Sequence, residues 1–167
     1  TRLTSMKDVQ ISDRPVSAEI IKGKLIGGKS SIAYLFRWNE YSTPEALYLL
    51  QDEGLITKVA TKDFSFNLNG SEAYFTHGTI LVPVPQQELG EEQIFNSVSE
   101  IAEKTGVDCY GLTTGLSPHG IDMGSGRFSR LEKPEILMFT GGRTSSYLAG
   151  EIWHLFDQNY RIPITNA

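Results

Sequence analysis

The sequence predicts an α/β domain in which helices flank a mostly parallel sheet. Three observations lead to this prediction. Residues 133–160 contain an apolar strand, a pair of glycines and an amphipathic helix, which together make a β-α unit. Two earlier passes of strand, helix and strand lie before residue 115, and strands joined through a helix are typically parallel. With 167 residues, 40% of them hydrophobic, the chain is long enough to bury a core.

The first two regions of the chain are expected to be an arm and an α/β unit. Residues 1–30 are polar at first and then alternate, which predicts an N-terminal arm followed by an edge strand. Residues 31–115 form the α/β unit. Its first helix starts at Ser42-Thr43-Pro44, a hydroxyl cap followed by proline, and stops at Gly54. Its second helix carries an apolar stripe of Ile94, Val98, Ile101 and Ala102.

The last third of the chain is divided at a lysine-proline pair. Residues 116–133 have no apolar period and several glycines, so they are interpreted as a connector loop, with a functional loop as the alternative. Residues 134–167 start a β-α-β unit, which either joins the first sheet or stands apart from it. Strands are predicted near residues 16–26, 32–37, 55–60, 78–84, 108–113, 135–140 and 162–166.

Composition excludes several classes of partner. The net charge of -5 and the pI near 5.2 argue against nucleic acid, because no basic patch offsets the acidity. No apolar run approaches the roughly 18 residues that a membrane helix needs, so we expect no membrane insertion. The composition neither favours nor excludes a homo-oligomer, so this partner is kept as an alternative. The chain begins at Thr1 without a recognisable leader, which suggests an excised or processed piece.

The glycines that follow the strand near residue 136 are the first candidate site. Backbone N–H groups at a helix start bind anions and other ligands, so the loop and helix start are candidate ligand-binding residues: Gly141, Gly142, Arg143, Thr144, Ser145 and Ser146. The glycine spacing matches neither the dinucleotide fingerprint nor a P-loop. A purely structural turn is therefore the competing interpretation, and the ligand would be a small molecule or a glycan.

Sequence motifs for catalysis are incomplete. Ser117 lies in Gly-Leu-Ser-Pro-His, close to a nucleophile elbow, but the motif ends in His119 and Pro118 has no N–H for an oxyanion hole. The single cysteine, Cys109, excludes an internal disulfide and lies in an alternating stretch that predicts a buried, unreactive thiol. A hydrolase or amidotransferase using Ser117 or Cys109 with His119 is the enzymatic alternative. Glu151 and His154 have a metal-ligand spacing but no further ligands, so no metal site and no catalytic residue is predicted.

The chain from about residue 31 resembles a known family. The segments that carry the resemblance are IAYLFRWNEYSTPEALYLL, GTILVPV, TGLSPHGIDMGSGRF and, above all, LEKPEILMFTGGRTSSYLAGEIWHLFDQNYRIPIT. They resemble the region downstream of the catalytic domain in bacterial M14-type zinc carboxypeptidases. In that group the stretch from about Lys133 is similar to the opening of a class I glutamine amidotransferase-like, flavodoxin-like domain.

The resemblance implies an accessory role. The family holds zinc through a His-x-x-Glu pair, and none of the three histidines here has a glutamate three residues downstream. No zinc or catalytic residue is carried over, so the expected cofactor, zinc, would lie in the parent's catalytic domain, outside this chain. The resemblance thus implies a non-catalytic domain that positions, binds or stabilises, with the parent's peptidase domain as partner and an exported parent, periplasmic or extracellular.

Overall fold

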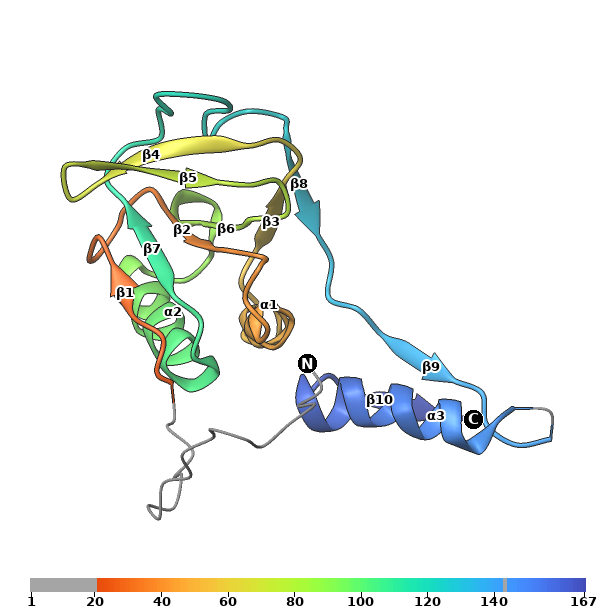
Figure 1. Ribbon diagram of the computed structural model, residues 1–167. Helices are drawn as coiled ribbons and strands as arrows, with labels where there is room; N and C mark the ends of the chain where they lie inside the picture. The colour runs from red at the N-terminus through yellow and green to blue at the C-terminus, as the bar shows by residue number, and fades with distance from the viewer. Residues whose placement is uncertain (1–20, 143) are drawn as a thin grey trace, which may run out of the picture.

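A six-stranded sheet forms the centre of the molecule (Figure 1). The computed structural model describes residues 21–142 and 144–167. The strands of this sheet are β1 (Leu25–Ile26), β2 (Ala33–Phe36), β3 (Thr57–Ala60), β6 (Ile80–Pro83), β7 (Cys109–Leu112) and β8 (Phe128–Leu131). The predicted strands at 32–37, 55–60, 78–84 and 108–113 are confirmed with shorter bounds. Of the strand predicted at 16–26, residues 16–20 lie outside the described part and β1 occupies the end.

The sheet is mixed and mostly antiparallel, which corrects the prediction of a mostly parallel sheet. The strand order is β1-β7-β2-β6-β3-β8, and only β1 and β7 run parallel. β2 and β3 are joined through a helix, as predicted, but β6 lies between them; β2 likewise separates β6 from β7. Two split β-α-β units are therefore interleaved, and β2, β3, β6 and β7 have the ferredoxin-like order.

Two helices cover one face of the sheet (Figure 1). They are α1 (Thr43–Asp52) and α2 (Glu91–Thr105). α1 ends before Gly54, as the sequence predicts, and α2 ends at Gly106 in a left-handed conformation. The apolar stripe of α2 packs with Tyr34 and Phe36 of β2 in one core cluster. A short 3-10 turn, η1 (Val84–Gln86), follows β6.

A hairpin of β4 (Phe64–Leu68) and β5 (Ser71–Phe75) covers the opposite face (Figure 1). Phe64, Phe66 and Phe75 pack with Ala33 and Leu35 of β2 in a second core cluster. The strand β2 is thus buried on both faces, which explains its continuous apolar run. The two strands are joined by a turn at Asn69-Gly70, and neither strand was among those predicted from the sequence.

The predicted connector of residues 116–133 contains a strand. β8 pairs with β3 at the sheet edge, in register from Thr57 with Leu131 to Ala60 with Phe128. Arg130 and Ser129 are exposed in β8, so the strand lacks the apolar run that marks a central strand. Residues 116–127 and 132–133 of this region remain outside the strand.

The last unit of the chain projects from the body (Figure 1). It consists of β9 (Ile136–Met138), α3 (Ser146–Trp153), a π-helical continuation η2 (His154–Asn159) and β10 (Ile164–Asn166). β9 and β10 pair in parallel with each other and form a sheet of their own. Residues 134–167 thus contain a β-α-β unit whose two strands do not join the six-stranded sheet.

Candidate functional site

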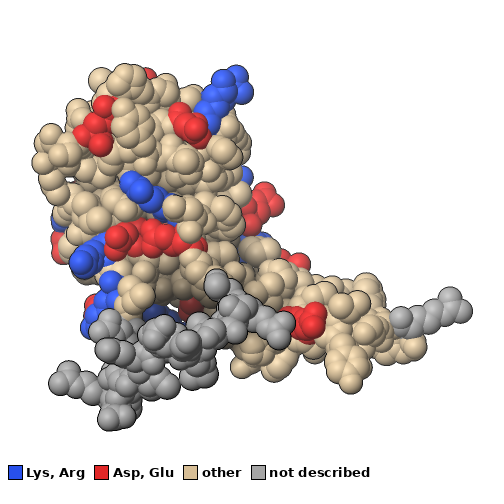
Figure 2. Space-filling view, viewed as in Figure 1, with Lys and Arg blue, Asp and Glu red and all other residues tan. Residues whose placement is uncertain are grey.

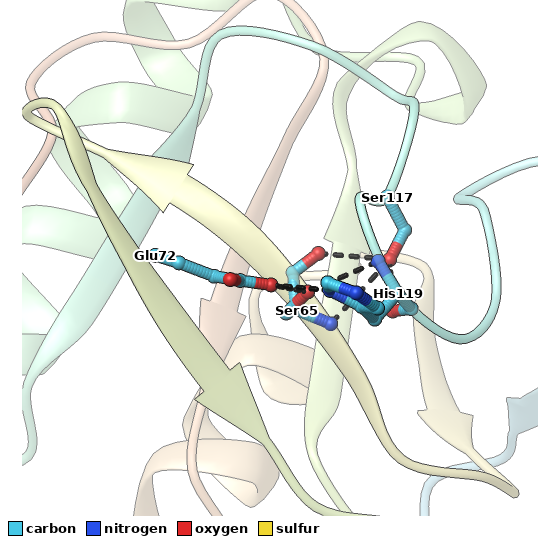
Figure 3. A network of polar contacts seen from close by, with 4 residues as sticks. All are labelled: Ser65, Glu72, Ser117 and His119. Atoms are coloured by element: carbon cyan, nitrogen blue, oxygen red, sulfur yellow. Dashed lines mark hydrogen bonds and ion pairs between the residues drawn. The ribbon is translucent and has the colours of Figure 1, made fainter.

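Four polar side chains form a network on the outer face of the hairpin (Figure 3). The Ser65 hydroxyl donates to Glu72 Oε1 at 2.6 Å, and His119 Nδ1 lies 2.7 Å from the same oxygen. The Ser117 hydroxyl contacts the carbonyl oxygens of Ser65, at 2.8 Å, and of His119. The Ser65 backbone N–H donates to the His119 carbonyl at 2.9 Å. The network therefore fastens the loop of residues 116–127 to strand β4.

The register of the hairpin places these residues together. Phe64 pairs with Phe75 and Phe66 with Ala73, so these side chains face the core. The intervening residues, Ser65 opposite Tyr74 and Asn67 opposite Glu72, point to the outer face. The loop crosses that face and leaves Ser65 fully buried.

A glycine lets the loop come close to the hairpin. Gly120 has φ +94°, and a Cβ there would lie 2.3 Å from the Asp63 carbonyl oxygen. Only glycine fits both the left-handed backbone and this approach. The peptide after His119 thus sits directly against the start of β4.

Hydrogen bonds keep the carboxylates of this region ionised. The Ser65 hydroxyl and then the His119 ring lower the pKa of Glu72. The backbone N–H and then the ring of His77 lower the pKa of Asp63, which accepts from them at 2.7 and 3.0 Å. The charge of Glu72 and its hydrogen bond raise the pKa of Tyr74. His77 is consequently oriented by Asp63, and His119 by Glu72.

The network has the residue types of a hydrolase triad but a different geometry. In a triad the serine hydroxyl donates to the imidazole. Here Ser117 Oγ donates to backbone carbonyls, while the imidazole of His119 faces Glu72. Of the hydrogen bonds within residues 21–142 and 144–167, none joins Ser117 Oγ or Cys109 Sγ to a histidine ring nitrogen.

The cysteine lies in the core, as predicted. Cys109 in β7 is fully buried, and burial raises the pKa of its thiol well above the ordinary value. The neutral thiol packs in the cluster between the sheet and the helices. A buried thiol of this kind is a poor nucleophile.

The predicted glycine loop lies where the sequence places it. Gly141 and Gly142 connect β9 to α3, which begins at Ser146 after Ser145 in an extended conformation. Both glycines have positive φ, and Thr144 N–H donates to the Gly141 carbonyl at 3.0 Å. Arg143 lies outside the described residues.

A cavity of about 370 Å³ borders this loop. Its lining combines the loop, the first turns of α3 and the end of β10: Met138, Thr140, Gly141, Gly142, Thr144, Ser146, Ala149, Gly150, Trp153 and Asn166. It therefore opens at the carboxyl end of two parallel strands, the usual ligand position in α/β units. The structure brings Gly141, Gly142, Thr144 and Ser146 to this cavity, whereas Ser145 is outside its lining.

The remaining histidines do not gather metal ligands. Glu151 in α3 and His154 at the start of η2 are both exposed. Among the described residues, no group of three or more His, Cys, Asp or Glu side chains is arranged to hold a metal ion. His77 Nδ1 lies 3.0 Å from Asp63 Oδ1.

Sequence reasoning singled out Ser117 and His119 but missed their partners. Ser65 and Glu72 lie 52 and 47 residues away from the loop residues that they contact. The alternation of Phe64, Phe66 and Leu68 is the signal that could have identified β4 and placed Ser65 on its outer face. Glu72 carried no comparable signal.

Comparison with known proteins does not assign this chain. No protein-family model, curated protein or solved structure matches it. In the described part of the chain, no helix has the length and apolar character needed to cross a bilayer. What the chain does must therefore be inferred from its own residues.

Proposed function

We propose that this chain is a non-catalytic accessory domain of an M14-type zinc carboxypeptidase, and that its β9-α3-β10 unit docks on the parent's peptidase domain. The apolar surface of that unit carries the docking part of the proposal. The identity of the parent rests on the resemblance of residues 131–165 to the family. Zinc belongs, in this proposal, to the peptidase domain.

The β9-α3-β10 unit leaves most of its apolar residues in solvent. No residue of α3 is buried, although the helix sequence is mostly apolar. Phe139 is 71% exposed and Leu148 61% exposed. Large apolar side chains are exposed on the helix, its continuation and the strand side alike: Leu137, Phe139, Tyr147, Leu148, Ile152, Trp153 and Leu155. Parallel sheets are normally covered on both faces, so this unit is suited to pack against another surface.

Charge is sparse on the same unit. From residue 134 to residue 167 the charged residues are Glu135, Arg143, Glu151, Asp157 and Arg161. Figure 2 shows the visible face of the projecting unit as nearly uncharged, in contrast to the body. Contiguous apolar surface of this kind marks protein interaction sites.

We also propose that the unit is of the flavodoxin-like, class I glutamine amidotransferase-like type. Its support is the parallel pairing of β9 with β10 through α3, together with a glycine loop at the carboxyl end of β9. The six-stranded sheet is a separate element with ferredoxin-like order. In this proposal the six-stranded sheet with its helices forms the folded body, and the β9-α3-β10 unit beside it forms the docking surface.

The first experiment compares the purified chain with the full parent protein. Zinc content and hydrolysis of a blocked dipeptide are measured on both. We expect zinc and turnover in the parent alone. Stoichiometric zinc or turnover in the purified chain contradicts the accessory role, and an inactive parent contradicts the carboxypeptidase assignment.

A second experiment tests the docking surface in the parent. The double change Leu137→Ser and Phe139→Ser removes two exposed apolar side chains of the unit. We expect a lower melting temperature of the peptidase domain, because its docked surface becomes exposed. The control is Leu116→Ser in the loop, where the leucine is 72% exposed. Equal behaviour of the double variant and the control argues against docking through this unit.

A small-molecule or glycan site at the Gly141–Ser146 loop is the second candidate. The cavity of about 370 Å³ beside the start of α3 favours it. Its lining offers backbone groups of the glycine loop, the hydroxyls of Thr144 and Ser146, and the ring of Trp153. Hydroxyls with one aromatic ring are a lining suited to a sugar.

Fluorescence of Trp153 tests this candidate. Trp38 is replaced by phenylalanine so that Trp153 is the single tryptophan, and the protein is titrated with the trimer of N-acetylglucosamine and with inorganic phosphate. A saturable change that Gly142→Val abolishes is the expected result for a ligand loop. The absence of a saturable change with either probe favours a structural turn.

A further inference from the structure

The hairpin carries a second cavity, on the other side of the molecule from the docking unit. Its volume is about 240 Å³, and it lies between the start of β4, the end of β5 and the loop at residues 119–120. Asp63, Tyr74, Thr76 and His119 are among its lining residues. We call it the hairpin cavity. It is smaller than a typical pocket for a drug-sized ligand, which occupies about 300–1,000 Å³, and suits the end of a single side chain.

Hydrogen-bond acceptors dominate the polar lining of the hairpin cavity. Asp63 Oδ1 takes both contacts from His77, at 2.7 and 3.0 Å. Asp63 Oδ2 makes none of the hydrogen bonds or ion pairs present among the described residues. Asp63, which lines the cavity, therefore keeps one carboxylate oxygen outside the interactions of the described residues.

The pairing of His119 adds a second acceptor. His119 Nδ1 lies 2.7 Å from Glu72 Oε1, and an ionised carboxylate only accepts hydrogen bonds. Nδ1 must therefore carry the hydrogen, and in the neutral ring Nε2 then presents a lone pair. No hydrogen bond to Nε2 is present among the described residues. The Glu72 carboxylate thus selects the tautomer in which Nε2 accepts, and His119 is one of the residues that line the cavity.

Aromatic rings complete the lining. The Tyr74 side chain lines the cavity and is 65% exposed, while Phe64 and Phe75 stack beneath it with ring centres 5.4 Å apart. The guanidinium carbon of Arg37 already lies 4.9 Å from the centre of the Phe75 ring. Aromatic faces attract cations, and Tyr74 offers such a face to solvent.

The charges around the cavity favour a cation over an anion. Asp63 and Glu72 are ionised at neutral pH. The Arg37 guanidinium stacks between the rings of Phe75 and Tyr110, and Lys62, next to Asp63 in the chain, is exposed. An anion would meet carboxylates and a ring lone pair at this site.

We propose that the hairpin cavity binds a small organic cation of the guanidinium or ammonium class, such as the end of an arginine or lysine side chain. Its donors would reach Asp63 Oδ2 and His119 Nε2, and its charge would lie over Tyr74. A guanidinium, with several donors and no acceptor, complements this lining best. This role is independent of docking through the β9-α3-β10 unit.

Amide chemical shifts of the full chain test the proposal. The probe is Nα-acetyl-arginine amide, and Nα-acetyl-citrulline amide is its neutral counterpart of nearly the same shape. We expect saturable shifts of the Thr76 and Gly120 amides with the arginine probe. Asp63→Asn should weaken binding by about tenfold, since a hydrogen bond to a charged group is lost. Glu53→Gln, on the exposed end of α1, makes the same change of charge and should have no effect.

A second variant keeps the proposal testable if Asp63→Asn does not fold. Asp63 also orients His77, so a variant that keeps Asp63 is needed. Tyr74→Leu, at an exposed position, removes the aromatic face together with the Tyr74 hydrogen bond to Glu72. It should weaken the arginine probe several-fold. Equal binding of the citrulline and arginine probes would overturn the proposal. So would the absence of saturable shifts at the solubility limit of the arginine probe, or equal affinities of Asp63→Asn, Tyr74→Leu and Glu53→Gln.

Discussion

Glu72 is the residue through which the hairpin holds the loop of residues 116–127. Its carboxylate receives the Ser65 hydroxyl and the His119 ring, so one side chain joins β4, β5 and the loop. Ser65 is fully buried beneath the loop, whereas His119 is largely exposed. Loss of the Glu72 charge would weaken the hydrogen bond that the buried Ser65 hydroxyl donates, because bonds to an ionised acceptor are the stronger ones. The local order of the loop therefore depends on an ionised carboxylate.

The variant Glu72→Gln should reduce the free energy of unfolding at neutral pH and weaken its dependence on pH in the acid range. The pKa of Glu72 is lowered in the folded state, first by Ser65 and then by His119. Its contribution is therefore present above the unfolded value of about 4.3 and is lost as the pH falls through the lower folded value. Urea denaturation at a series of pH values measures this.

The matched control for this prediction is Glu53→Gln. The Glu53 carboxylate makes none of the hydrogen bonds or ion pairs found in the described part of the chain. Parallel stability curves for the wild type and Glu72→Gln across the acid range would contradict the role given to Glu72.

Gly120 sets how closely the loop approaches β4. Gly120→Ala should destabilise the protein by more than about 1 kcal/mol, because the backbone is left-handed and the new Cβ would meet the Asp63 carbonyl. Gly124→Ala, in the same loop, has open space around the new Cβ and should change stability by about 0.5 kcal/mol or less. Thermal denaturation of the two variants decides between a close approach and a loosely held loop.

At the scale of elements, α1 and α2 differ from α3 in how much of their apolar surface is packed against the rest of the molecule. α1 and α2 bury apolar residues against the sheet, and Leu50 of α1 is fully buried. In α3 no residue is buried. The first two helices thus stabilise the body, whereas α3 contributes an apolar surface that a partner can cover.

Alanine substitutions should separate these helices. Leu50→Ala should cost about 2–5 kcal/mol of unfolding free energy, the usual range for a leucine in a packed core. Leu148→Ala, which starts from 61% exposure, should cost about 0.5 kcal/mol or less in the isolated chain. A large loss of stability for Leu148→Ala would show that α3 is packed in solution.

At the scale of the whole molecule, a few contacts hold the β9-α3-β10 unit on α1. Arg161 Nε lies 3.2 Å from Glu45 Oε1, and the Glu45 side chain is only 10% exposed. The rings of Tyr41 and Tyr160 are in contact, and Ile162 is buried. Lys133 binds Asp52 at 2.5 Å. The unit is therefore positioned by contacts at its base, and its apolar surface stays open.

A double-mutant cycle of Glu45→Gln and Arg161→Asn should reveal coupling between the unit and α1. Arg161 has φ +53°, and asparagine tolerates this left-handed backbone, so the second variant removes the ion pair without adding strain. We expect a coupling free energy of about 0.5–3 kcal/mol and faster hydrogen exchange in residues 134–167. Additive effects of the two changes would mean that this ion pair does not position the unit.

The sequence by itself determined the elements whose signals are local. Continuous apolar runs identified β2 and β6, an apolar stripe identified α2, and the glycines at 141 and 142 identified the turn into α3. The burial of Cys109 also followed from its alternating neighbours. These signals are readable because periodicity reports how each residue is buried within its own element.

Only the tertiary structure decided the strand order and the composition of the polar network. β6 inserts between β2 and β3, and periodicity does not report which strand lies beside which or in what direction. β8 is an edge strand with exposed polar residues, so its pairing with β3 left no apolar signal. Glu72 meets His119 across 47 residues, because the loop folds back over the hairpin. Pairings at such a separation depend on the packing of the whole chain, and no local pattern records them.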